Sequence, residues 1–146
     1  MKKMTGDERR AFLSHGTRTG KLATVRPDGR PHIAPIWFVL DGSSEAGDIP
    51  VFTTGAETVK GRAIRRDPRV ALLVDDERPP FAYVLIEGTA EVSDDLDQML
   101  DWATRIGGRY MGADRAEAFG RRNAVAGELL VRVNPTRVLA RTGIAD

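Results

Sequence analysis

Alternating and continuous apolar runs along the chain predict a mainly β protein. Residues 21–25 alternate between apolar and polar positions, and the apolar segment 31–40 follows a Pro-Asp-Gly turn, so together they predict a hairpin. Longer apolar runs without alternation are typical of strands that are buried on both faces. We expect six or seven short antiparallel strands in all, at residues 21–25, 31–40, 49–54, 70–74, 81–92, 128–133 and 136–140.

Pro35 interrupts the second of these strands. Because proline lacks a backbone N–H, it cannot donate to a strand ladder, so this strand is expected at a sheet edge or with a bulge. Either placement leaves the peptide groups of residues 34–37 free to pair with something other than a strand. A corner is expected at Asn134-Pro135, between the last two strands.

Helical patterns are fewer and lie between the strands. Thr5 and Glu8 have the spacing of a capping box, which predicts a short helix at the start of the chain. Residues 93–95 begin the longest helix, which carries a stripe of apolar residues and is expected to end at Gly107-Gly108.

A further short helix is expected after Asp114, and a polar loop at residues 41–48. Short antiparallel strands with helices at their periphery predict a small β-barrel instead of a doubly wound parallel sheet. We expect one domain over residues 1–146, because the chain has no internal repeat and no linker.

Composition narrows the class of protein further. The chain has 41% hydrophobic residues and no cysteine, which excludes disulfides and thiolate chemistry. The formal net charge of +1 does not indicate a nucleic-acid-binding protein, because acidic neighbours accompany both arginine pairs, at 65–66 and 121–122. No apolar run is long enough to span a membrane, and the charged first residues lack a signal-peptide pattern, so we expect a cytoplasmic location.

The segment 51–69 carries the clearest chemical signal. It predicts a strand that passes through a glycine turn into the start of a helix, where free N–H groups and the helix dipole favour an anion. Thr58 and Lys60 add a hydroxyl and an ammonium group at that point, and Lys60 is one of only four lysines beside eighteen arginines. The alternative is a solvated lysine on a surface helix.

Four segments in this order resemble the pyridoxamine 5′-phosphate oxidase-like split-barrel superfamily. They are Gly20 to Phe38, Phe52-Thr-Thr with Lys60, Arg66 to Val74 and Ile86 to Glu91. The resemblance covers nearly the whole chain and implies an FMN-binding type of split β-barrel, in a homodimer that holds two flavin-type cofactors at the subunit interface.

Two stretches, 74–81 and 109–133, resemble the actinobacterial branch that uses the deazaflavin coenzyme F420. The oxidases hold the FMN phosphate partly through an Arg and a Lys, where this chain aligns as Ala34 and Val39. Tyr83 aligns with an oxidase glutamine that reaches the flavin across the dimer. These departures favour coenzyme F420 over FMN and argue against pyridoxamine phosphate oxidation.

The resemblance implies a set of cofactor-binding residues. The phosphate is expected on Thr58, Lys60 and Arg62, and the ring against the backbone of Ala34 to Trp37 and against Thr53 and Thr54. Phe81 and Tyr83 of a partner subunit, with Tyr110 as a further candidate, are expected to close the cleft. The residues expected to bind the cofactor are Ala34, Pro35, Ile36, Trp37, Thr53, Thr54, Thr58, Lys60, Arg62, Phe81 and Tyr83.

Several of these residues also have plain structural interpretations. Trp37 either flanks the cofactor or fills the barrel, and a Thr-Thr pair is common in strands. Tyr83 or Tyr110 is a candidate proton donor.

His15 and His32 are the only histidines, and neither has a partner at metal-ligand spacing, so no metal site is expected.

The function that this pattern favours is an F420-dependent oxidoreductase that transfers a hydride between the reduced cofactor and a small conjugated organic substrate. Hydride transfer needs stacking and alignment more than a catalytic dyad, so the absence of an obvious dyad is expected. The alternatives are an FMN-dependent oxidase or reductase, and a non-catalytic protein that stores or shields a flavin, F420 or haem.

Overall fold

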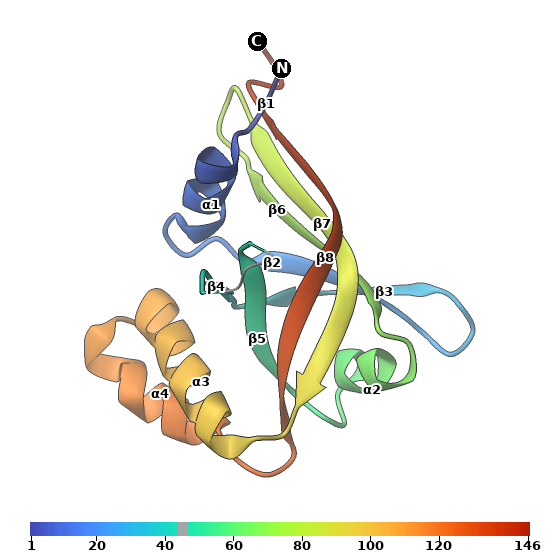
Figure 1. The fold of residues 1–146 in the computed structure, drawn as a ribbon, viewed down its shortest axis with the longest axis vertical. Coiled ribbons are helices and arrows are strands. Elements are labelled where there is room, and N and C mark those ends of the chain that lie inside the picture. The colour runs from blue at the N-terminus through green and yellow to red at the C-terminus, as the bar shows by residue number, and fades with distance from the viewer. Residues whose placement is uncertain (44–46) are drawn as a thin grey trace.

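One antiparallel sheet forms the frame of the protein (Figure 1). The structure is a computed structural model that describes residues 1–43 and 47–146. The described strands are β1 Lys2–Lys3, β2 Gly20–Val25, β3 Pro31–Ile36, β4 Val39–Asp41, β5 Ile49–Gly55, β6 Arg69–Asp76, β7 Ala82–Ser93 and β8 Glu128–Thr142. The described helices are α1 Gly6–Ser14, α2 Val59–Arg66, α3 Leu96–Met111, the 3-10 helix η1 Ala113–Arg115 and α4 Ala116–Asn123.

The strand order closes the sheet almost into a barrel. Neighbours follow the order β3-β2-β6-β7-β8-β5-β4, with β1 paired to β8, so β3 and β4 lie at opposite edges. Only Trp37 and Phe38 separate these two strands in the chain, which brings the two edges together without pairing them. The fold is therefore mainly β with peripheral helices, an open sheet of the split-barrel type. Pro35 lies on the edge strand β3, as its missing N–H predicts.

Two strand boundaries differ from the expectation. The single strand expected at 31–40 is divided into β3 and β4, because Phe38 turns into the core, where it is fully buried. The two strands expected at 128–140 form the continuous β8, and its corner at Asn134-Pro135 is replaced by a bulge. Gly88 permits this bulge, since a Cβ there would lie 2.3 Å from the carbonyl oxygen of Asn134. With the short β1 added, the described part of the chain has eight strands instead of six or seven.

The helices also correct two expectations. Helix α3 does not end at Gly107-Gly108 but continues to Met111, and Gly112 at a φ of 101° follows it. Asp114 makes no capping hydrogen bond at the 3-10 helix in which it lies. The capping box is present, because the N–H of Glu8 donates to the hydroxyl of Thr5 at 3.1 Å and the Glu8 side chain accepts in return.

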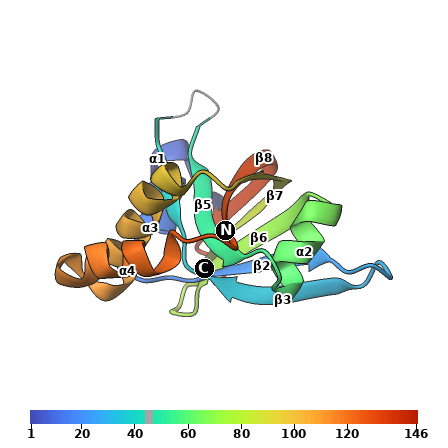
Figure 2. The same ribbon diagram turned by 90° about the horizontal axis from the view of Figure 1, so that it is seen from below.

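Buried apolar residues form one cluster on each face of the curved sheet. The inner face, together with α1 and α2, buries the main core around Phe38, Phe52 and Leu72. A smaller cluster, which includes Met99 and Trp102, fills the space between α3 and β5. Figures 1 and 2 show that α3 and α4 cover one side of this end of the sheet while α2 covers another.

Asp41 at the end of the edge strand β4 makes a polar contact with β8, which lies two strands away in the sheet. The hydroxyl of Ser43 donates to its carboxylate at 2.6 Å, and the guanidinium of Arg132 on β8 pairs with the same carboxylate. These hydrogen bonds, that of Ser43 first, lower the pKa of Asp41 to about 2 although its burial acts the other way. The polar loop expected at 41–48 falls partly on residues 44–46, which lie outside the described residues.

The outer face of the sheet carries a second apolar row. We use "outer row" for Leu73, Leu85 and Leu139, which are direct cross-strand partners on β6, β7 and β8. Leu73 is 36% exposed, and Ile33 on the neighbouring hairpin is 66% exposed. The sheet therefore has apolar residues on both faces. Helix α3 covers the outer face at β5, whereas Leu73 of the outer row stays partly exposed.

Candidate functional site

A cleft of about 220 Å³ lies between the edge strand β3, the start of α2 and the helices α3 and α4. We call it the Lys60 cleft. Five of the residues expected to bind a cofactor line it, namely Pro35, Ile36, Trp37, Thr53 and Lys60, together with Ile106, Phe119 and Asn123 from the two helices. The fold therefore brings together residues that lie up to 88 positions apart, from Pro35 to Asn123.

The start of α2 is fixed by Thr58 and a glycine. The hydroxyl of Thr58 accepts the N–H of Gly61 at 3.1 Å and donates to the carbonyl of Gly55 at 2.8 Å. A Cβ at Gly61 would lie 2.1 Å from that carbonyl oxygen, so only glycine lets the helix start approach the turn this closely. Thr58 thus acts as the N-cap of α2, and its hydroxyl is used within the chain.

Lys60 is the cation of the cleft. Among the described residues, no carboxylate lies within ion-pair distance of it, although Glu128 at the start of β8 is near enough to feel its charge. Burial raises the pKa of Glu128, and the charge of Lys60 opposes this effect. Arg62 points elsewhere, because its guanidinium pairs with Glu57 at 3.0 Å on the exposed side of the helix.

The two threonines of β5 face different environments. Thr53 lines the Lys60 cleft, whereas Thr54 is buried and its hydroxyl lies 3.2 Å from that of Thr58. Ala34 on β3 pairs with Leu22 of β2 and is not among the residues that line the cleft. The expected ring position against residues 34–37 is thus represented in the cleft by Pro35, Ile36 and Trp37.

Trp37 is held in a stack of aromatic rings. Its ring centroid lies 4.9 Å from that of Tyr110 with an interplanar angle of 4°, and 5.7 Å from that of Phe119. The side chain is 41% exposed, so Trp37 forms part of the cleft wall instead of filling the barrel.

Tyr110 supports that wall from the inside. Its hydroxyl donates to the carbonyl of Arg18 at 2.8 Å and accepts the N–H of Phe38 at 3.2 Å. Burial raises the pKa of Tyr110. A hydroxyl that is committed to two backbone groups is poorly placed to donate a proton to a substrate, so this geometry disfavours Tyr110 as a proton donor.

Arg109 supports the wall of the Lys60 cleft, a role that the sequence did not reveal. Its guanidinium donates to three backbone carbonyls, those of Gly16 at 2.9 Å, Leu13 at 2.7 Å and Phe38 at 2.6 Å. Burial lowers the pKa of Arg109. The side chain therefore ties α1 and the β3–β4 connection to α3, which fixes the wall that carries Trp37. Nothing distinguishes this arginine from the other seventeen in the sequence.

Phe81 and Tyr83 lie in a different pocket. A mainly apolar hollow of about 490 Å³ is lined by both residues and by Leu73 and Ile144. Phe81 has a φ of 67°, in the left-handed region that non-glycine residues rarely adopt, and is 40% exposed. Within one chain the structure does not bring these two residues to the Lys60 cleft.

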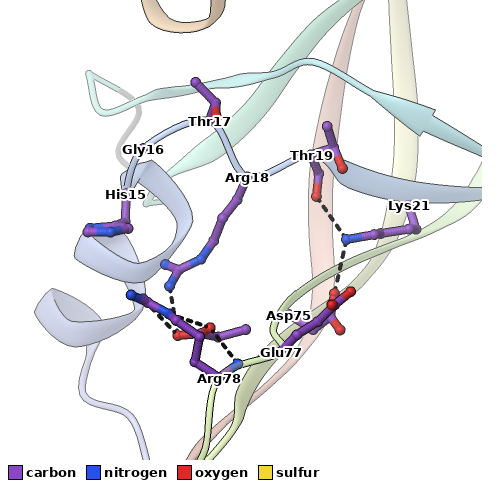
Figure 3. A pocket seen from close by; sticks show the side chains of 10 residues that line it. His15, Gly16, Thr17, Arg18, Thr19, Lys21, Asp75, Glu77 and Arg78 are labelled. Carbon is purple, nitrogen blue, oxygen red and sulfur yellow. Dashed lines mark hydrogen bonds and ion pairs between the residues drawn. The ribbon is translucent and has the colours of Figure 1, made fainter.

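A third pocket, of about 450 Å³, is lined by charged groups whose charges are already matched (Figure 3). Arg18 pairs with Asp76 at 3.0 Å, and Lys21 pairs with Asp75 at 2.9 Å. Arg78 also pairs with Asp76, at 3.1 Å. Because each of these cations already has a carboxylate partner, this pocket is a weaker anion site than the Lys60 cleft.

No group of three or more His, Asp or Glu residues in the described part of the chain is arranged to hold a metal ion. No helix over residues 1–43 and 47–146 has the length and apolar character needed to cross a bilayer. The Lys60 cleft is lined by groups that are suited to an anion. Its donors are an ammonium, the N–H groups of a helix start, a hydroxyl and the backbone beside a proline.

Comparison with known proteins identifies the family of this chain. The family model described as pyridoxamine 5′-phosphate oxidase matches residues 5–141. An F420H2-dependent biliverdin reductase of Mycobacterium tuberculosis is 32% identical over 104 residues, which cover 71% of each chain.

Two solved structures extend the similarity to the fold. The conserved hypothetical protein Rv2991 of Mycobacterium tuberculosis has a TM-score of 0.83 at 26% identity, covering 96% of this chain and 86% of that one. An F420 reductase has a TM-score of 0.66 at 29% identity, covering 88% and 94%. The chain therefore belongs to the pyridoxamine 5′-phosphate oxidase family.

Proposed function

We propose that the protein is an F420-dependent oxidoreductase that transfers a hydride between the reduced deazaflavin and a small conjugated organic molecule. The observation that supports it best is the Lys60 cleft, where a helix start lies beside an aromatic wall and an edge strand. Within residues 1–43 and 47–146 the ammonium of Lys60 at this helix start has no carboxylate partner. The similar proteins named as F420 reductases support the choice of cofactor. Bound reduced deazaflavin would supply the hydride.

The anionic tail of the cofactor belongs at the start of α2 in this proposal. The first N–H groups of a helix have no intrahelical partner, and Thr58 satisfies only that of Gly61. Lys60 adds a formal charge at the same point, so a phosphate gains both hydrogen bonds and a counterion there. Thr58 contributes as the cap that fixes this geometry. Arg62, which is paired with Glu57, is the weakest of the residues expected at this site.

The ring of the cofactor belongs against β3 and β5. Because β3 is an edge strand, its backbone beside Pro35 has polar groups free for a ring edge that carries carbonyls and an N–H. Thr53 and the plane of Trp37 would orient the ring and exclude water from one of its faces. These groups hold and align the cofactor, which is what hydride transfer requires of the protein.

The second half of the cleft would come from a second copy of the chain. The outer row of Leu73, Leu85 and Leu139 is an apolar surface that a monomer leaves to water, which supports a homodimer. Phe81 and Tyr83 border the same face, on β7 or just before it, and would reach the partner's cleft. Tyr83 remains the candidate proton donor. Leu73→Glu should convert the dimer to a monomer in sedimentation and weaken cofactor binding with it.

The same cleft could hold FMN, which is the second candidate cofactor. The family is named for an oxidase, and Lys60 would pair with the phosphate of either FMN or F420. The positions aligned with the oxidase phosphate ligands are Ala34 and Val39, which carry no charge, and this difference favours F420. A non-catalytic carrier of flavin, F420 or haem would use the same surface without turnover.

Titration of the full chain with F420 and with FMN, followed by ligand fluorescence, tests the proposal directly. We expect tighter binding of F420 than of FMN. Lys60→Ala should weaken F420 binding about tenfold or more, because a charge-assisted contact of about 1.5–3 kcal/mol is lost. Arg62→Ala is the matched control, one charge removed from the same helix outside the cleft, and should change affinity little.

Equal affinity of wild type and Lys60→Ala would show that the anion does not bind at the start of α2. Turnover of reduced F420 with a panel of quinones, enones and tetrapyrroles then separates an enzyme from a carrier. Binding without oxidation of the cofactor by any acceptor would favour storage.

A further inference from the structure

Helix α4 supplies a wall of the Lys60 cleft that differs in chemistry from the rest. Phe119 and Asn123 face the cleft one helical turn apart. The side-chain N–H of Asn123 donates to the carbonyl of Phe119 at 2.8 Å, which orients the carboxamide. Among the described residues this is the only hydrogen bond of that amide, so its oxygen and second N–H are free to bind a ligand.

Two glycines let α3 and α4 pack in close contact, which holds this wall in place. A Cβ at Gly107 would lie 2.8 Å from Cβ of Phe119, and one at Gly120 would lie 2.1 Å from the hydroxyl of Thr104. Phe119 is also held by its stack on Trp37. The positions of Phe119 and Asn123 are thus set by backbone packing, which suits a group that must discriminate between ligands.

The two sides of the cleft select for different groups. Lys60 attracts an anion, whereas Asn123 carries no charge and prefers a neutral carbonyl or N–H. A cofactor anchored through its anionic tail at Lys60 and through its ring edge at β3 leaves the α4 wall to a second molecule. Phe119 offers that molecule a ring to pack on, which favours a planar conjugated compound.

We infer that α4 is the substrate-selecting wall of this protein. The carboxamide of Asn123 hydrogen-bonds a neutral carbonyl of a planar conjugated substrate, which packs on Phe119. This inference rests on the proposed function, because it requires a cofactor on the Lys60 side. It makes Asn123 a residue that determines specificity between acceptors, without a part in holding the cofactor.

A comparison of two hydride acceptors tests the role of Asn123. Menadione has two carbonyls, whereas methylene blue is a planar acceptor that has none. We expect Asn123→Leu to lower kcat/KM for menadione about tenfold relative to methylene blue, since one hydrogen bond to the substrate is lost. The dissociation constant of the cofactor should stay within about twofold of the wild-type value.

Asn123→Ser replaces the leucine variant if that variant folds poorly. Serine is too short to reach the substrate but keeps a polar end to the helix, so it should lower kcat/KM for menadione relative to methylene blue in the same way. Arg122→Ala, on the exposed side of α4, is the control and should leave the ratio unchanged. An equal loss for both acceptors, or a loss that is matched by weaker cofactor binding, would overturn the inference.

The wild type is titrated first, and the kinetics use F420 or FMN, whichever it binds. A wild type that binds only FMN refutes the proposed cofactor but leaves the comparison of acceptors intact. A wild type that binds neither refutes the proposed function and this inference together, before any variant is compared.

Discussion

Alanine at two adjacent glycines of α3 should have opposite effects on stability. Gly107 and Gly108 both lie inside the helix, where alanine is preferred over glycine by about 0.5–1 kcal/mol. A Cβ at Gly108 meets only Cβ of Ala116, at 3.7 Å, which is an ordinary contact. Gly108→Ala should therefore stabilise the protein by about 0.5–1 kcal/mol.

Gly107→Ala should destabilise it. The new Cβ would lie 2.8 Å from Cβ and 3.0 Å from Cγ of Phe119, so α4 would have to move away from α3. Forcing extra atoms into a packed contact costs about 1–3 kcal/mol, which exceeds the helix-propensity gain. We expect a net loss of about 1–2 kcal/mol, so the two variants should differ by about 1.5–3 kcal/mol.

Thermal unfolding followed by far-UV circular dichroism measures the difference. For a chain of this size 1 kcal/mol corresponds to about 3 °C, so Gly107→Ala should melt about 3–6 °C below the wild type. Gly108→Ala should melt about 2–3 °C above it. The near-UV circular dichroism of the Trp37 stack should change only in Gly107→Ala, because Phe119 is part of that stack. A Gly107→Ala protein that melts at or above the wild-type temperature would refute the close α3–α4 packing.

Three further predictions concern caps and charges. Thr58→Ala should lower stability by about 1–2 kcal/mol, through loss of the N-cap and of the hydroxyl beside buried Thr54, whereas Thr58→Ser should restore most of it; urea unfolding measures both. Asp41 has a pKa of about 2 in the folded protein against about 3.9 in the unfolded chain. Its contribution to the free energy of unfolding is therefore present above pH 4 and lost as the pH falls toward 2. Asp41→Asn should cost about 1–2 kcal/mol at pH 7 and little at pH 2, and equal losses at both pH values would contradict this assignment. Burial raises the pKa of Glu128, so its ionisation destabilises the fold as the pH rises; Glu128→Gln should be slightly more stable at pH 8. The same variant should bind an anionic cofactor about two- to fivefold tighter beside Lys60, and weaker binding in a titration would contradict the predicted repulsion.

Local signals in the sequence identified most of the secondary structure. Thr5 caps α1, residues 93–95 lead into α3 with Asp95 as the cap, and Pro35 lies on an edge strand. The glycine turn before α2 is present as well, with Thr58 at the cap. Each of these features depends on residues within a few positions of one another, which is why a sequence pattern suffices.

The boundaries that differ are those decided by distant contacts. Gly107 reads as a helix end, but packing against Phe119 makes it a helix interior. Asn134-Pro135 reads as a corner, but Gly88 on the neighbouring strand absorbs it as a bulge. Such outcomes depend on which segments meet in space, and no local pattern contains that information.

The residues of the candidate site likewise fall into those that the sequence predicted and those that it did not. Pro35, Thr53 and Lys60 were grouped by resemblance to a family, and they line one cleft. The opposite wall, formed by Phe119 and Asn123, has no short-range signature, because a phenylalanine and an asparagine four positions apart are ordinary on a helix. The positions of Phe81 and Tyr83 relative to the cleft remain a prediction about a second copy of the chain.

Arg109 has a consequence for how the binding site comes into being. Its three acceptors lie 71, 93 and 96 residues earlier in the chain, so no contiguous fragment shorter than that span can assemble the wall that carries Trp37. During synthesis the strands up to β7 emerge before this arginine, whereas β8, which joins β7 to β5, emerges after it. The wall that carries Trp37 can thus be tied in place only when most of the chain has emerged, shortly before β8 completes the sheet.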